Sequence, residues 1–275
     1  VGEPGCGAGF AARCLAADYL YPQGGPHAEA VLKKEDAECL VLQGEGASGQ
    51  IPVKKVREAR EAIQRSALST DAAGRVLFIY GAQNLNGSSA NAMLKIIEEP
   101  PEGVLFLLTA TSAATVLPTI RSRCAAYTIA PVPTADCAAR LRAERLPAKA
   151  ADELAFLFEG HIGTALKSWN DPTAKAALSM AKTLCGYAAQ GDTYRALTLL
   201  TKYERDREGF STLLWTLDQL CSAVLRRPAY GQEQCGGLTP EGAARTLNAA
   251  ARARKSLTGN GNLRLIVAVL AGELA

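Results

Sequence analysis

The chain opens on a glycine-rich stretch, VGEPGCGAGF, whose spacing matches a phosphate-binding loop of the pattern G-x-x-x-x-G-K-[ST]. Gly2 and Gly7 take the two fixed glycine positions. In such a loop backbone N–H groups surround the phosphates, the lysine contacts them and the hydroxyl residue helps to hold Mg²⁺. Ala8 stands in the lysine position and Gly9 in the hydroxyl position. The sequence therefore predicts a loop that has lost its chemistry, with weak nucleotide binding through backbone N–H groups as the alternative.

A second part of the same chemistry is missing after the apolar run RVLFIY at residues 75–80, which is typical of a buried strand. In ATPases with a phosphate-binding loop an acidic pair follows this strand, where the aspartate helps to hold Mg²⁺ and the glutamate polarises the attacking water. Here Tyr80 and Gly81 take the two positions, and neither has a carboxylate. The chain is therefore not expected to hydrolyse ATP.

The elements that position these residues follow a strand–helix alternation as far as residue 131. Apolar runs alternating with amphipathic segments predict a parallel sheet with helices on both faces. From residue 132 no strand pattern recurs, and the sequence predicts helices only. The strands are expected at residues 39–42, 75–80, 104–111 and 125–131, and the helices between them at 9–20, 53–68 and 88–99.

Two longer motifs carry a resemblance to a known family. Residues 91–101 read NAMLKIIEEPP and residues 117–124 read LPTIRSRC. Both resemble motifs of the AAA+ subunits of bacterial DNA polymerase III clamp loaders. The resemblance implies an AAA+ core over residues 1–131, a helical lid over 132–172 and a helical collar over 173–275. It also implies a strand before the phosphate loop, so we expect the chain to be truncated ahead of Val1 and the sheet to lack its first strand.

The resemblance further indicates a subunit that does not hydrolyse ATP. In ATPase subunits of this family the lid carries a basic sensor residue in a run like G-S-L-R-D-A-L. Here the run is GHIGTAL, and Gly163 takes the position of the arginine. The lysine, the acidic pair and the sensor are thus all absent. The alternatives are a weak but active ATPase of the same fold, or a DNA-binding scaffold with a decayed ATPase fold.

The Ser-Arg-Cys motif, Ser122, Arg123 and Cys124, is intact. The resemblance implies that Arg123 reaches across to the γ-phosphate of ATP held by a neighbouring subunit, with Ser122 and Cys124 positioning it. An arginine supplied in this way stabilises the charge of the transition state. The alternative is a surface arginine at the end of the sheet.

The resemblance implies that the partners are the ATPase (gamma/tau) subunits and the delta subunit in a hetero-oligomeric ring. No membrane partner is expected. The sliding clamp would be contacted indirectly, and primer-template DNA through the assembly. Lys54, Lys55 and Arg57 on one amphipathic helix are candidates for contacts with DNA phosphates, which are independent of sequence. The alternative is an exposed helix whose basic residues pair with neighbouring glutamates such as Glu58.

No cofactor is expected. The eight cysteines include no C-x-x-C pair, and Cys14, Cys39 and His27 are too far apart in sequence to indicate a tetrahedral zinc site. The chain shows no signal peptide, and no apolar run reaches the roughly 18 residues of a membrane helix. These features favour a cytoplasmic protein with reduced cysteines. The net charge is +3, and the basic excess of residues 173–275 fits either an acidic partner or a solvated surface.

Overall fold

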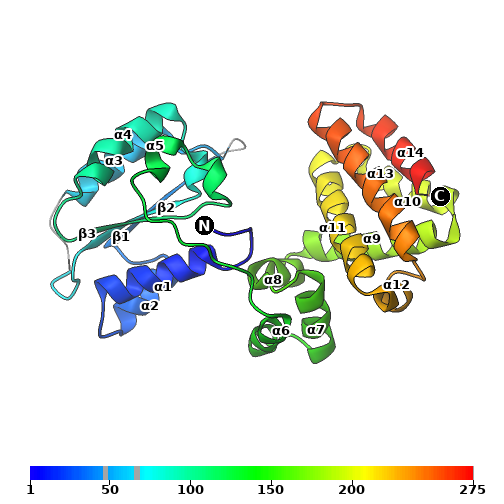
Figure 1. Cartoon of the computed structure of the whole chain (residues 1–275), viewed down its shortest axis with the longest axis horizontal. Coiled ribbons are helices and arrows are strands. Elements are labelled where there is room, and N and C mark those ends of the chain that lie inside the picture. The colour runs from blue at the N-terminus through cyan, green and yellow to red at the C-terminus, as the bar shows by residue number, and fades with distance from the viewer. Residues whose placement is uncertain (46–48, 65–68, 275) are drawn as a thin grey trace. The chain divides into compact units, whose positions relative to one another are not determined.

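The computed structural model describes residues 1–45, 49–64 and 69–274. It contains two compact units, Val1–Pro131 and Val132–Ala275, of which the first is α/β and the second is helical (Figure 1). The expected lid and collar both lie in the second unit, so the boundary between them at residue 172 stays a prediction.

The first unit is built on a parallel sheet whose described strands have the order β1-β2-β3. The strands are β1 (Cys39–Gln43), β2 (Arg75–Tyr80) and β3 (Val104–Leu108). Val41 of β1 lies beside Phe78 of β2, and Phe78 lies beside Leu107 of β3. β2 is buried from its first residue to Ile79, as expected for a continuous apolar strand that is covered on both faces.

Helices cover both faces of this sheet (Figure 1). Val76 and Phe78 of β2 pack in one core cluster with α1 and α2, whereas Leu77 and Ile79 pack in another with α3 and α4. This alternation is the two-residue period of a β-strand. The predicted α/β class with a parallel sheet and helices on both faces is therefore confirmed. The helices are α1 (Ala8–Leu20), α2 (Pro26–Lys33), α3 (Val53–Ile63), α4 (Gly87–Glu98) and α5 (Pro118–Arg121), and the single turns are η1 (Ala82–Asn84) and η2 (Ala113–Thr115).

Three sequence-based expectations differ from this structure. The strand expected at 104–111 ends at Leu108. Residues 125–131 do not form a strand. Within the described residues their backbone bonds run to the chain start, where the Ile129 N–H donates to the Val1 carbonyl at 2.7 Å and the Val1 amino group donates to the Tyr127 carbonyl at 2.7 Å. Apolar composition alone does not make a strand, because a strand needs a paired neighbour along its length. The helix expected over 53–68 ends at Ile63, and residues 65–68 lie outside the described residues.

α4 ends at the site of interest and is bounded by clear local signals. Its first turn is capped by Asn86, whose side chain accepts the Ser89 N–H at 2.9 Å. Its last residue is Glu98. Glu99 and then Pro100 and Pro101 follow, and proline cannot continue a helix. The side chain of Glu98 is thereby held at the C-terminal end of α4, next to α5.

The second unit is all helical within the described residues, which confirms the predicted class for this part. One hydrophobic core runs through it, with Phe210, Leu213, Leu217 and Leu220 of α11 fully buried. The helices are α6 (Thr134–Ala143), α7 (Ala148–Leu157), α8 (Ile162–Asn170), α9 (Pro172–Gln190), α10 (Thr193–Leu200), α11 (Arg207–Arg226), α12 (Pro228–Gln234), α13 (Pro240–Thr258) and α14 (Leu263–Glu273), with the single turn η3 (Thr201–Tyr203). None of the helices in the described chain is long and apolar enough to span a membrane.

The buried thiol of Cys39 makes the first unit sensitive to alkaline pH. Burial and the nearby Asp36 carboxylate raise the pKa of Cys39 from 9.0 to about 11. The folded chain therefore keeps a proton that the unfolded chain loses above pH 9, so stability falls as pH rises from about 9 to 11. We expect a loss of about 1 kcal/mol between pH 8 and pH 10 from this group.

Urea unfolding of the wild type and of Cys39→Val at the two pH values measures this loss. The variant has no thiol at this position. Its free energy of unfolding is therefore expected to fall by about 1 kcal/mol less than that of the wild type between the two pH values. An equal fall in wild type and variant would contradict the assignment. Tyr21, whose pKa burial raises from 10.0 to about 12, contributes equally to wild type and variant, so the difference between the two reports Cys39.

Candidate functional site

The glycine loop turns into α1 without any side-chain cap. Gly5 and Gly7 have φ angles of 88° and 98°, a left-handed conformation that glycine adopts at no steric cost. Gly7 directly precedes Ala8, the first residue of α1, and no side chain accepts a hydrogen bond from the first turn. The N–H groups of that turn have no partner within the helix, which is the feature that binds anions at helix starts.

The ring of Tyr80 lies against this helix start. A Cβ atom placed on Gly9 would come within 2.7 Å of Tyr80 Cε2 and 3.4 Å of its hydroxyl oxygen. A serine or threonine at position 9, as a magnesium-binding loop requires, would therefore collide with the ring. Lys34, which follows α2, places its ammonium 5.1 Å from the centre of the same ring, close enough for a cation–π contact. The ring thus occupies the space beside the residue that would hold Mg²⁺.

Gly81 also has a backbone conformation that a residue with a carboxylate side chain rarely adopts. Its φ angle is 80°, and a Cβ there would come within 2.9 Å of Asn84 Nδ2. Its N–H donates to Thr109 Oγ1 at 3.2 Å. The turn after β2 therefore places Tyr80 and Gly81 where the acidic pair would stand, and fixes them with contacts that a nucleotide site does not need.

Arg123 lies just after α5, and its guanidinium is held by three neighbours. The Nε–H donates to Glu98 Oε1 at 2.5 Å, and Nη2 forms an ion pair with the same oxygen. Nη1 donates to the Thr119 carbonyl at 2.8 Å and to Ser122 Oγ at 3.2 Å. The side chains of Arg123 and Glu98 are 33% and 45% exposed. The guanidinium is thus ordered on the surface of its own subunit.

The two other members of the motif have different surroundings. Ser122 Oγ donates to the Thr119 carbonyl at 3.2 Å while it accepts from Arg123, so it links the arginine to the last turn of α5. Cys124 is half-buried and packs against the core cluster beneath α3 and α4. Burial raises the pKa of its thiol. Their predicted positioning roles stay predictions, and Glu98 is the partner that motif reading did not assign.

The candidate DNA-binding residues lie on α3, and two of the three have acidic neighbours. Lys54 Nζ is 3.9 Å from Glu58 Oε1, and Lys55 forms an ion pair with Glu45. Arg57 is exposed, and no ion pair joins it to the described part of the chain. The expected pairing with a glutamate of the same helix is therefore present for Lys54, whereas Lys55 pairs with Glu45 outside the helix. Contact with DNA stays a prediction.

The remaining sequence-predicted positions give no nucleotide or metal site of their own. Gly163 lies in the first turn of α8, in the second unit. His27 stacks on Tyr21, and its Nδ1 is 3.6 Å from an oxygen of Asp36. Within the described ranges no group of three or more histidine, cysteine, aspartate or glutamate residues could hold a metal ion. The expected absence of zinc remains a prediction.

Comparison with known proteins identifies the class. A family model described as "DNA polymerase III, delta subunit" matches residues 20–133. DNA polymerase III subunit gamma/tau of Mycobacterium tuberculosis is 33% identical over 128 residues, which cover 44% of this chain and 22% of the relative. A solved gamma subunit-related protein from Thermotoga maritima aligns over 90% of this chain and 89% of its own, with a TM-score of 0.46 and 16% identity. The chain is thus similar to subunits of DNA polymerase III.

Within this class the similarity extends to one subunit in particular. DNA polymerase III subunit delta' of Escherichia coli is 28% identical over 196 residues, which cover 71% of this chain and 57% of the relative. The delta' subunit of Haemophilus influenzae is 38% identical over 79 residues, which cover 29% and 24%. The chain therefore spans between a quarter and about half of the length of these relatives. The recognition of a delta-prime-like clamp-loader subunit is confirmed.

Proposed function

We propose that the chain is a non-hydrolysing subunit of the bacterial DNA polymerase III clamp loader, of the delta-prime kind. It supplies Arg123 to the ATP site of a neighbouring subunit. The observation that carries this proposal is the contact between Tyr80 and Gly9, because the ring fills the space beside the chain's own phosphate loop. The similarity to delta' subunits supports the same assignment.

The chemistry available to this chain is electrostatic. During phosphoryl transfer negative charge spreads over the γ-phosphate oxygens, and a guanidinium aimed at them stabilises the transition state. Arg123 lies two residues after a short surface helix, α5, and its side chain is one-third exposed, so a neighbouring subunit can reach it. The chain's own site lacks the groups that would do the same. Ala8 stands in place of the lysine, Gly9 in place of the hydroxyl residue and Tyr80 in place of the aspartate.

The proposed partners follow from this role. ATPase (gamma/tau) and delta subunits complete a hetero-oligomeric ring in the cytoplasm, and the helical second unit holds the ring together. ATP binding by the neighbours opens the sliding clamp, and hydrolysis releases it on primed DNA. The chain contacts the clamp indirectly and contacts DNA through the assembly, with Lys54, Lys55 and Arg57 as the candidate residues.

The isolated chain is expected to hydrolyse no ATP above a protein-free blank, because the groups that position Mg²⁺ and water are absent. Phosphate release by the purified chain measures this, with an ATPase subunit of the loader as the positive control. In the same preparation the chain is expected to co-elute with ATPase and delta subunits on gel filtration. Turnover by the isolated chain that Tyr80→Ala leaves unchanged and Gly7→Val abolishes would instead support the weak-ATPase alternative.

A further inference from the structure

We propose that Glu98 is a positioning residue that holds Arg123 on its own subunit until a neighbour's phosphate replaces it. The inference rests on the function proposed above, because it concerns the same arginine. It assigns to Glu98 a resting-state role that keeps the neighbouring ATP site slow until the assembly is engaged with clamp and DNA.

The hydrogen bonds of the guanidinium carry the first step. A guanidinium has five N–H donors and no acceptor. Two of those of Arg123 are directed to Glu98, and two are directed to Thr119 and Ser122. Among the described residues this leaves one N–H of Nη2 without an acceptor. A phosphate that binds the guanidinium through two N–H groups must therefore displace one of the present partners.

Charge decides which partner is displaced. The Thr119 carbonyl and the Ser122 hydroxyl are neutral and lie in the same short turn as the arginine. Glu98 is the anion, so it competes with a phosphate for the same positive charge. While the carboxylate is in place it offsets the charge that would stabilise the transition state. Release of Glu98 is thus the step that makes Arg123 available.

The position of Glu98 makes this contact reversible. As the last residue of α4 it lies at a helix C-terminus, where a carboxylate is unfavourable unless a cation is near. Arg123 is that cation. Both side chains are partly exposed, and ion pairs of this kind are weak. The pair is therefore strong enough to order the guanidinium but weak enough for a neighbour's phosphate to exchange with it.

The test is ATP hydrolysis by the loader reconstituted with this full chain, measured without and with clamp and primed DNA. Glu98→Gln keeps the shape of the side chain and removes its charge. We expect the basal rate to rise about two- to fivefold, the range that a surface ion pair can supply. We expect a smaller change in the stimulated rate, because Glu98 is then already displaced. Glu99→Gln is the matched control, since this neighbour is exposed and has no ion pair within the described chain, and it should change neither rate.

The double variant Glu98→Gln/Arg123→Ala separates positioning from a merely structural role. If Glu98 acts through Arg123, the double variant has the rate of Arg123→Ala alone, and the gain in basal rate disappears. If Arg123→Ala lowers hydrolysis but Glu98→Gln lowers or does not change the basal rate, the inference about Glu98 is wrong and the proposed function stands. If Arg123→Ala has no effect, the proposed function itself fails.

Discussion

Replacing Arg123 by alanine is expected to reduce ATP hydrolysis at the neighbouring site of the assembled clamp loader by about 10³-fold or more, the range known for arginines supplied in trans. The reason is that alanine removes the guanidinium that the Ser-Arg-Cys motif places at the surface just after α5. Clamp- and DNA-stimulated phosphate release by the reconstituted loader measures the effect. The measured rate is the sum over all ATP sites of the loader. It therefore falls by the fraction of the total rate that the site next to this chain contributes.

Two further substitutions make the result specific. Arg121→Ala is the matched control, because Arg121 is the last residue of α5 and, among the described residues, its side chain makes only a long contact, 3.5 Å, to the Ala113 carbonyl. It should leave the stimulated rate within about twofold of wild type, as expected for surface substitutions. Arg123→Lys keeps the charge but loses the planar fork, so only a small part of the rate should return. An effect of Arg121→Ala as large as that of Arg123→Ala would show that the motif only supports the fold.

The departures from the nucleotide-binding motifs can be seen in the sequence, but the structure around them cannot. Ala8, Gly9 and Tyr80 depart from motifs of fixed spacing, so each departure is visible without coordinates, and the loss of ATP hydrolysis stays a prediction. The contact between Tyr80 and Gly9 depends on how β2 packs against α1, and no local pattern encodes it. The same holds for Lys34, whose contact with the ring comes from the end of α2. Two departures that are 71 residues apart in the sequence, Gly9 and Tyr80, therefore lie against each other in the structure.

The fold likewise has elements that could be predicted from the sequence and elements that could not. The strand at 75–80 was predictable because a long apolar run is typical of a strand that is buried on both faces. The strand expected at 104–111 is present but ends at Leu108, and its residues are only half-buried. The strand expected at 125–131 was wrong because pairing depends on a neighbour that composition cannot reveal. Glu98 illustrates the limit for the site. Glu98 lies in a motif that can be recognised in the sequence. Its partner Arg123 is 25 residues away, and the packing of α4 against α5 brings the two side chains together.

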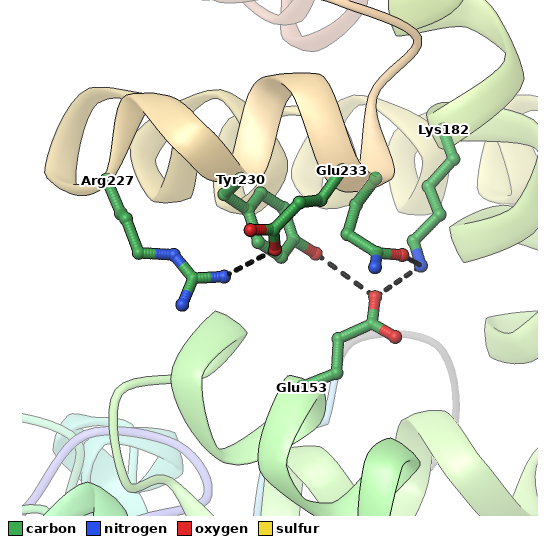
Figure 2. Close-up of polar contacts among 6 residues, drawn as sticks. Glu153, Lys182, Arg227, Tyr230 and Glu233 are labelled. Atoms are coloured by element: carbon green, nitrogen blue, oxygen red, sulfur yellow. Dashed lines mark hydrogen bonds and ion pairs between the residues drawn. The ribbon is translucent and has the colours of Figure 1, made fainter.

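The second unit contains a polar cluster that no motif indicated, and we expect its removal to have a large effect on stability. Figure 2 shows Glu153 of α7 between Lys182 of α9 and Tyr230 of α12. One oxygen of Glu153 pairs with the Lys182 ammonium and accepts the Tyr230 hydroxyl at 3.2 Å. Lys182 also donates to Gln234 Oε1 at 3.2 Å. Burial raises the pKa of Tyr230, so its hydroxyl remains a donor at ordinary pH.

Glu153→Ala should lower the free energy of unfolding of this unit by about 2–4 kcal/mol, because the Lys182 ammonium loses its carboxylate partner and the buried Tyr230 hydroxyl loses its acceptor. The side chains of Glu153 and Lys182 are only 19% and 24% exposed, so water replaces the lost contacts poorly. Thermal unfolding followed by circular dichroism measures the effect, and a fall of about 5 °C or more in Tm is expected.

Glu233→Ala is the matched control for this prediction, since Glu233 lies in the same cluster in Figure 2 but pairs with Arg227 in a half-exposed ion pair. Its loss should cost less than about 1 kcal/mol. If both variants unfold at the wild-type temperature, the cluster does not hold α7 to α9 and α12. If Glu153→Ala alone is destabilised, these three helices are joined by one buried carboxylate. Because α7 belongs to the expected lid and the other two to the expected collar, that carboxylate then joins the two parts, together with the ion pair between Glu159 and Arg226.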